Sequence, residues 1–119
     1  VERSRGLGDV YKRQDVVSPP ACRRLRELLD RSLDPERRKA DPENQVDGFL
    51  GEGLAQGTRL WSKAGWMSQA RHDAAWWQHG DQPPMLLVAF SSGPDRARDE
   101  QLLPALARSL SGFQASGDH

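Results

Sequence analysis

The feature that most constrains the fold is a change of hydrophobic period at Thr58. Before this residue, apolar side chains recur three or four positions apart, which is the spacing of an amphipathic helix. From Thr58 to Phe90 the sequence instead contains three segments with strand character, separated by turn residues. A final helical pattern follows. In a chain of 119 residues, this order predicts one α+β domain, in which an antiparallel β meander packs with N- and C-terminal helices.

The first helix is predicted over residues 19–33. Ser18 is a capping residue, and Pro19 and Pro20 follow it in the first turn, where proline is tolerated. The apolar face consists of Leu25, Leu28, Leu29 and Leu33. The polar stretch 34–47 predicts a short helical turn and a loop, and the apolar cluster at 49–54 predicts one further turn closed by glycine.

Three strands and a second helix are predicted in the rest of the chain. The strands cover residues 58–65, 70–78 and 86–90, with a turn at 79–81. The third strand is apolar at every position, so we expect an interior strand covered on both faces. The C-terminal helix is predicted over 99–112, with Pro104 in its first turns or kinking it. Its apolar stripe consists of Leu102, Leu103, Leu106 and Leu110.

Residues 4–14, SRGLGDVYKRQ, resemble a frame translation of a transposase-type sequencing adapter. We therefore predict that residues 1–14 are an artefactual, disordered leader and that the protein domain is 15–119. A reading frame that begins inside an adapter also predicts that the natural protein extends upstream of Asp15. On this interpretation the chain is the C-terminal portion of a longer domain.

Composition excludes several classes of function. Lys+Arg 17 balances Asp+Glu 17, so the basic surface expected of a nucleic-acid binder is lacking. The longest apolar run, 85–90, is far short of the roughly 20 residues that a membrane span needs. The single cysteine, Cys22, excludes an internal disulfide and a cysteine-based zinc site.

The histidines do not suggest a metal site. His72 and His79 are seven positions apart on a predicted strand and turn, so their side chains are expected on opposite faces. We expect no metal site and no cofactor.

Lys63 is the most informative polar residue. Outside the leader the chain contains eleven arginines and only two lysines. A lysine on a strand of so arginine-rich a chain indicates that a compact ammonium group is required there, although an exposed strand lysine is the simpler interpretation. Arg71 and Asp73 share a strand face, which leaves open whether they form a structural ion pair or whether Arg71 belongs to an anion-binding site.

Residues 15–113 resemble the class-A-like β-lactamase (serine hydrolase) family, which has the penicillin-binding-protein-like fold. The resemblance rests on the segment WSKAGWMSQARHDAA, in which Lys63-Ala64-Gly65 ends a predicted strand and Arg71-His72-Asp73 opens the next. Lys63-Ala64-Gly65 stands where the family has its third catalytic signature, K-T-G. The likeness implies that this strand forms one wall of an active-site cleft.

The resemblance also implies a role for individual residues. The Lys63 ammonium would lie beside the nucleophilic serine and the substrate carboxylate, and the Trp66 backbone N–H would donate to the oxyanion. Ala64, Gly65 and Arg71 would contact substrate. Ala64 replaces the usual threonine or serine, which removes a hydroxyl able to bind the carboxylate.

Other signatures of the family are missing from this sequence. It contains no Ser-x-x-Lys, no Ser-Asp-Asn and no G-x-S-x-G. We therefore expect the nucleophile in a parent protein that forms an acyl-serine intermediate with a β-lactam or a related small amide or ester. The isolated chain would be inactive, and the parent would be periplasmic or otherwise extracytoplasmic in a bacterium.

A second hypothesis is a non-catalytic, tryptophan-rich binding module. The four tryptophans are Trp61, Trp66, Trp76 and Trp77. They suit a stacking platform for bases or sugars, but the lack of a basic stripe beside them favours packing in the core and the cleft.

Overall fold

The computed structural model describes residues 17–116, so the predicted leader, 1–14, lies outside the described residues. The helical elements are α2 (Pro19–Leu29), α3 (Pro35–Ala40), the 3-10 helix η1 (Leu50–Gly53), α4 (Pro94–Arg98) and α5 (Leu102–Ser116). The strands are β1 (Asp30–Arg31), β2 (Arg59–Met67), β3 (Ala70–Gln78) and β4 (Met85–Ser92). None of these helices is both long and apolar enough to cross a bilayer.

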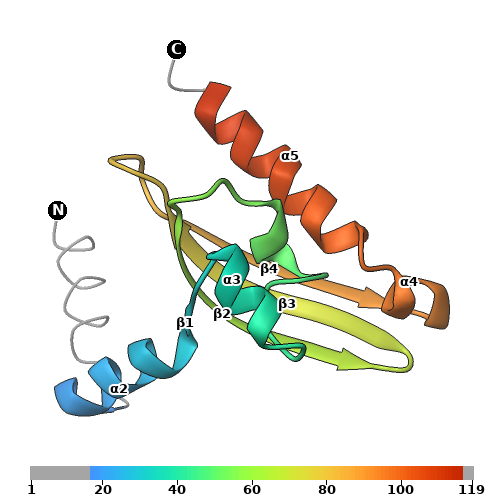
Figure 1. The fold of residues 1–119 in the computed structure, drawn as a ribbon, viewed down its shortest axis with the longest axis horizontal. Coiled ribbons are helices and arrows are strands. Elements are labelled where there is room, and N and C mark those ends of the chain that lie inside the picture. The colour runs from blue at the N-terminus through green and yellow to red at the C-terminus, as the bar shows by residue number, and fades with distance from the viewer. Residues whose placement is uncertain (1–16, 117–119) are drawn as a thin grey trace, which may run out of the picture.

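The strands form one antiparallel sheet in the order β1-β2-β3-β4 (Figure 1). The α+β meander is confirmed, and the short strand β1 adds to it. β3 has the predicted bounds. β2 begins one residue later than predicted and continues to Met67, because the two residues 68–69 alone form the turn and Met67 pairs with Ala70.

The first helix was predicted to reach residue 33, and this is wrong. α2 ends at Leu29 because the next two residues extend and pair with β2, Asp30 opposite Trp61 and Arg31 opposite Leu60. Helical spacing of leucines does not reveal this pairing. Leu33 is instead buried in the core from a loop, and no residue of α2 is buried.

The C-terminal helix was predicted over 99–112, whereas α5 begins at Leu102 and ends at Ser116, and the short helix α4, which was not predicted, precedes it. Pro104 lies in the first turn of α5, as predicted, where its missing N–H has no partner within the helix. The buried face of α5 contains Leu103 and Ala107, whereas Leu102 and Leu106 are exposed. The predicted leucine stripe is thus rotated about the helix axis.

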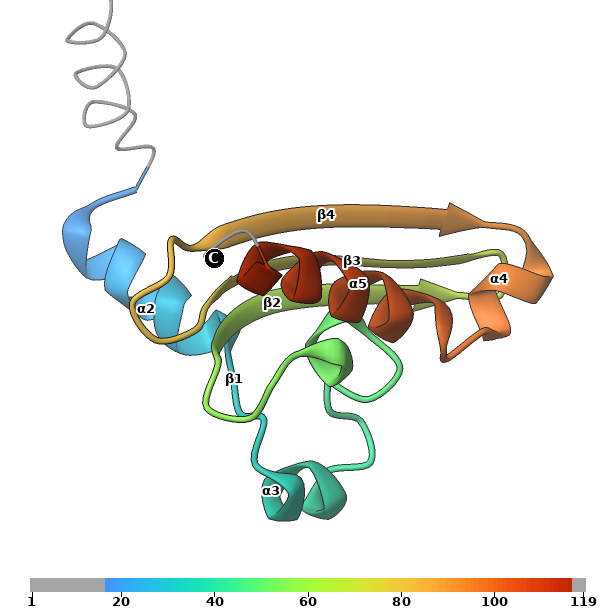
Figure 2. The same cartoon turned by 90° about the horizontal axis from the view of Figure 1, so that it is seen from above.

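The core lies between η1 and α5 on one side and one face of the sheet on the other, which we call the inner face (Figure 2). Its buried members are Leu33, Val46, Phe49, Leu50, Leu54, Leu60, Ala64, Ala75, Trp77, Leu103 and Ala107. The approach of η1 to α5 requires glycine at position 53, because a Cβ there would lie 2.1 Å from the Pro104 carbonyl oxygen.

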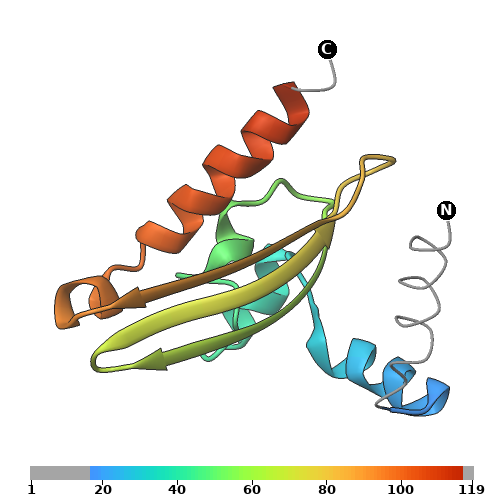
Figure 3. The same cartoon turned by 180° about the vertical axis from the view of Figure 1, so that it is seen from behind.

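β4 was predicted to be an interior strand, and this is wrong, because β4 is an edge strand that pairs with β3. Its side chains alternate: three lie against the core, whereas Leu86, Val88 and Phe90 on the opposite, outer face are 68%, 49% and 78% exposed. Figure 3 views the sheet from this outer side, with α3 and η1 behind the strands. A uniformly apolar run does not distinguish a doubly covered strand from one with a single covered face.

Candidate functional site

The candidate site is built on β2, whose side chains alternate between the two faces of the sheet. Leu60, Ser62 and Ala64 are buried on the inner face, whereas Lys63 is exposed on the outer face. β1 pairs with β2 only at residues 60 and 61. Beyond that point, residues 62–66 of β2 present backbone groups along what we call the open edge of the strand.

Three donors converge on one oxygen at the open edge. The Gln45 side-chain oxygen Oε1 accepts from the Ala64 backbone N–H at 2.8 Å, from Arg31 Nη2 at 3.3 Å and from Lys63 Nζ at 3.5 Å. A neutral amide oxygen thus occupies a position that two cations and one backbone N–H surround. Donors arranged in this way suit a carbonyl oxygen or an oxyanion.

The same edge carries further polar contacts. Arg31 donates from Nε and Nη2 to the Ser62 carbonyl at 3.1 and 2.9 Å, and the Lys63 ammonium donates to the Ala64 carbonyl. Since Ala64 directs its N–H and C=O to the open edge, the alternation of an antiparallel ladder directs the Trp66 N–H to that edge as well. The Lys63 ammonium and the Trp66 N–H therefore lie along one edge, although their side chains leave β2 on opposite faces.

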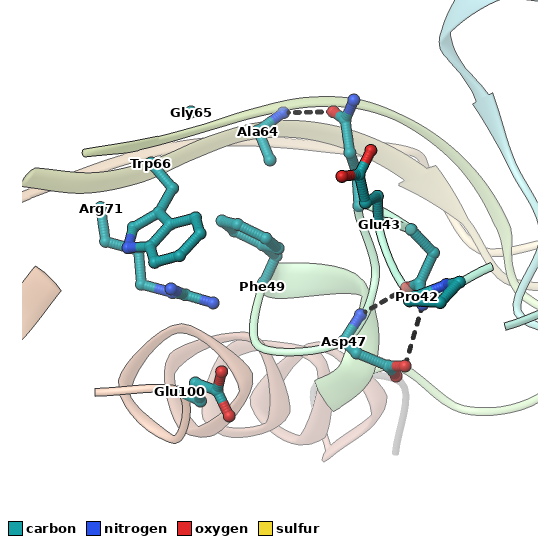
Figure 4. Close-up of a pocket in the computed structure, with 11 residues that line it drawn as sticks. Pro42, Glu43, Asp47, Phe49, Ala64, Gly65, Trp66, Arg71 and Glu100 are labelled. Atoms are coloured by element: carbon teal, nitrogen blue, oxygen red, sulfur yellow. Dashed lines mark hydrogen bonds between the residues drawn. The ribbon is translucent and has the colours of Figure 1, made fainter. Parts of the chain in front are cut away.

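A pocket of about 390 Å³ lies on the inner side of β2 (Figure 4). Three of the predicted substrate residues, Ala64, Gly65 and Arg71, line it together with Trp66, and Lys63 does not. The ionisable residues of its lining are Glu43, Asp47, Glu100 and Arg71. The lining alone has a net charge of −2 when all four groups are ionised, and the pocket remains net negative when the Arg38 guanidinium that pairs with Asp47 is included. This charge disfavours an anionic ligand.

Arg71 is buried, with 4% of its surface exposed. Its Nε donates to the Gly48 carbonyl at 3.0 Å and its Nη1 to the Ala97 carbonyl at 3.4 Å. The guanidinium lies 4.3 Å from the centre of the Phe49 ring and 5.8 Å from that of Trp66. Arg71 therefore joins β3 to the loop before η1 and to α4, in addition to lining the pocket.

Gly65 has a packing reason to be glycine. It is the register partner of His72, and a Cβ at position 65 would lie 2.0 Å from the His72 ring nitrogen Nε2. The imidazole in turn packs on Phe90, with ring centres 5.4 Å apart. The glycine of the Lys63-Ala64-Gly65 triplet thus leaves space for a side chain of the neighbouring strand.

Asp73 is buried on the inner face beside the site, with 1% of its surface exposed. Its Oδ2 accepts from the Leu50 N–H at 3.1 Å, whereas its Oδ1 and the Ser62 hydroxyl are buried without a hydrogen-bond partner. Burial raises the pKa of the Asp73 carboxyl, against the opposing effects of the Leu50 N–H and the Arg31 and Lys63 charges. The salt bridges of the described residues do not include an Arg71–Asp73 pair. The two residues therefore share a strand face without forming the ion pair that the sequence left open.

The histidines are used in packing and hydrogen bonding. His79 Nδ1 lies 2.9 Å from the Thr58 hydroxyl, and His72 packs against Phe90. Within the described part of the chain, no three His, Cys, Asp or Glu side chains come together as a possible metal site.

Comparison of the sequence with known protein families identifies the family of this chain. A family model described as the β-lactamase enzyme family matches residues 4–113. The chain belongs to the β-lactamase enzyme family. Its α+β fold agrees with that membership, which places it among hydrolases. The match includes residues 4–14, so it does not separate the predicted leader from the domain. No curated protein matches the chain.

Sequence reasoning missed two residues of this candidate site, Arg31 and Gln45. Arg31 fell within the predicted first helix, and Gln45 within a polar stretch interpreted as a loop. Neither has a motif that points to the open edge of β2, because loop folding alone brings Gln45 to Ala64.

Proposed function

We propose that the open edge of β2 is one wall of the active site of a serine hydrolase that acts on β-lactams or related amides and esters. The observation that carries this proposal is the convergence of Lys63 Nζ, the Ala64 N–H and Arg31 on a single carbonyl oxygen. A substrate carbonyl or carboxylate oxygen has the same acceptor chemistry as the Gln45 amide, and it gains more from two adjacent cations once it carries charge.

In the proposed reaction, the oxygen of a serine attacks the substrate carbonyl carbon and its proton passes to a base. The carbonyl oxygen becomes an oxyanion, to which the Trp66 N–H donates. When the oxyanion collapses, the carbon–nitrogen or carbon–oxygen bond breaks and the leaving atom takes a proton. Water then hydrolyses the acyl-serine ester. The serine and its base belong to polypeptide outside this sequence, which has no Ser-x-x-Lys.

The two sides of β2 support different roles in this proposal. Lys63 provides the positive charge for the substrate carboxylate, and the Ala64 methyl group adds no donor of its own. The pocket on the inner side has a net negative charge, so Arg71 acts there as a positioning residue that holds the loop carrying Phe49 behind the strand. Gly65 allows the close packing of His72 beside the strand.

The test uses the complete catalytic domain, including the nucleophile. We expect Lys63→Ala to lower kcat/KM for a chromogenic β-lactam by about 2–4 kcal/mol of transition-state stabilisation. Lys39→Ala is the matched control, because Lys39 is an exposed lysine of α3. We also expect the 119-residue chain alone to form no acyl-enzyme with a fluorescent penicillin. Unchanged acylation of the Lys63→Ala domain would refute the assignment of β2 as a catalytic wall.

A further inference from the structure

A second pocket lies on the outer face of the sheet, beside α2. Its lining consists of Arg26 and Leu29 of α2, Arg59 and Trp61 of β2, and Trp76 of β3, and its volume is about 370 Å³. Trp61 and Lys63 are two residues apart on the same face of β2, so the pocket is about 7 Å along the strand from Lys63. It shares no lining residue with the pocket on the inner side of β2.

The apolar part of this pocket is a pair of indole rings. Trp61 and Trp76 are opposite each other in the register of β2 and β3, and their ring centres lie 4.6 Å apart with the planes tilted by 50°. Trp76 keeps 37% of its surface exposed. A flat aromatic ring gains both buried area and favourable quadrupole contacts when it packs on such a pair.

The polar part of the pocket is cationic. The Arg59 guanidinium carbon lies over the Trp61 ring, 4.8 Å from its centre, within cation–π distance. The salt bridges among the described residues involve neither Arg26 nor Arg59. Asp30 is opposite Trp61 in the register but does not line the pocket. Two arginines and this one carboxylate leave a net charge of +1.

We propose that this pocket binds a small monocarboxylate that carries a flat aromatic ring. The ring packs on Trp61 and Trp76, and the carboxylate accepts from the guanidinium of Arg59. The argument concerns binding to this chain itself and holds whether or not β2 is a catalytic wall. The exposed outer-face side chains of β4, Leu86, Val88 and Phe90, are apolar, so the two arginines set this pocket apart from that part of the face.

The test measures binding of three probes with the same ring to the 119-residue chain. The probes are 1-naphthylacetate, its neutral amide 1-naphthylacetamide, and the cation 1-naphthylmethylammonium, each titrated against the assigned indole N–H resonances in ¹H–¹⁵N spectra. We expect the Trp61 and Trp76 signals to shift first. We expect the acid to bind about fivefold more tightly than the amide, the ratio of one exposed ion pair, and the cation to bind most weakly.

Variants separate the two parts of the pocket. Arg59→Gln, a change at an exposed position, should make the affinities of acid and amide equal, and Trp76→Ala should remove binding of both. Val88→Ala is the matched control, because Val88 is exposed on the same face but does not line the pocket. The proposal is overturned by equal affinity of the unmodified chain for acid and amide, by absence of binding, or by an equal loss in Val88→Ala. Indole shifts that depend on protein concentration without a probe would also overturn it, because a second copy would then cover the pocket.

Discussion

Gln45 illustrates how one neutral side chain can organise two cations. Its amide oxygen is the common acceptor for Arg31, Lys63 and the Ala64 N–H. Without that oxygen, the positive charges of Arg31 and Lys63 would have no shared acceptor at the open edge, and the Ala64 N–H would depend on solvent.

Gln45→Leu, which keeps the size of the side chain, should lower the free energy of unfolding by about 1–2 kcal/mol, because three donors lose their acceptor at a partly buried position. Urea unfolding of the chain measures this change. Gln56→Leu is the control, since Gln56 lies in an exposed turn. Equal stability of the two variants would show that the donor cluster contributes nothing to the fold.

Asp73 gives the fold a pH dependence with an unusual sign. Its pKa is raised above 3.8 by burial, so the folded state holds a proton that the unfolded state releases. Below pH 3.8 this carboxyl is protonated in both states and does not lower the free energy of unfolding. As the pH rises from there through the raised pKa, the unfolded state ionises more readily than the folded state, and the free energy of unfolding decreases. Asp73→Asn should therefore gain stability relative to the unmodified chain as the pH increases over that window, measured by urea unfolding at several pH values.

Asp47 provides the control of opposite sign. Burial alone would raise its pKa, but hydrogen bonds from Asn44 and Arg38, together with the Arg38 charge, lower it below 3.8. Its contribution to stability is present above pH 3.8 and is lost as the pH falls through the lowered pKa. Asp47→Asn should lose stability at neutral pH and match the unmodified chain in strong acid. The same pH profile for both variants would contradict the difference assigned to their environments.

At the scale of elements, the packing of η1 against α5 holds the inner side of the site. η1 supplies the Leu50 N–H that binds Asp73, and α5 covers it from the other side. Gly53 allows this contact, because its α-carbon lies close to the backbone of the first turns of α5. The position of Asp73 next to β2 thus depends on a helix that is distant in sequence.

Gly53→Ala should destabilise the fold by about 3 kcal/mol or more, since the added Cβ meets backbone atoms that cannot rotate away. Gly112→Ala is a useful comparison within α5. A Cβ there meets nothing within 4 Å, so alanine should stabilise the helix by about 0.5–1 kcal/mol. Thermal unfolding of both variants measures the difference, and a neutral Gly53→Ala would refute the close packing of η1 and α5.

At the scale of the whole molecule, the elements that form the core cover one face of the sheet, and on the other face α2 lies beside one end of β2. η1 and α5 pack on the inner face, whereas the outer face carries Lys63, the indole pocket and the exposed side chains of β4. The two functional proposals therefore concern different places on the sheet, the open edge of β2 and the outer-face pocket beside α2.

The prediction that residues 1–14 derive from a sequencing adapter is tested by their deletion. An adapter origin would leave the melting temperature of the chain unchanged, because such a segment has not been selected to contact the domain. Differential scanning calorimetry of chains 1–119 and 15–119 measures this. A chain lacking only residues 117–119 serves as the control for shortening. A decrease of several degrees on deletion of 1–14, about 1 kcal/mol of stability in a domain of this size, would argue against an adapter origin.

The local pattern of apolar, turn and capping residues was sufficient to predict much of the fold from the sequence. The change of period at Thr58, the turn residues and the capping serine correctly predict an α+β meander with helices on either side, and β3 to the residue. The resemblance of residues 15–113 to the β-lactamase family is confirmed by the family match, whereas the assignment of Lys63-Ala64-Gly65 to a catalytic signature stays a prediction.

Only the tertiary structure decided which faces are covered and which distant residues meet. Strand pairing ended α2 at Leu29. Phe90 is exposed because it lies on the face of β4 opposite the core, although the sequence of β4 is that of a buried strand. Gln45 reached Ala64 through the fold of a loop whose sequence has no periodic signal. Periodicity records which side chains share a face, but burial depends on what packs against that face, and this is a property of residues far apart in the chain.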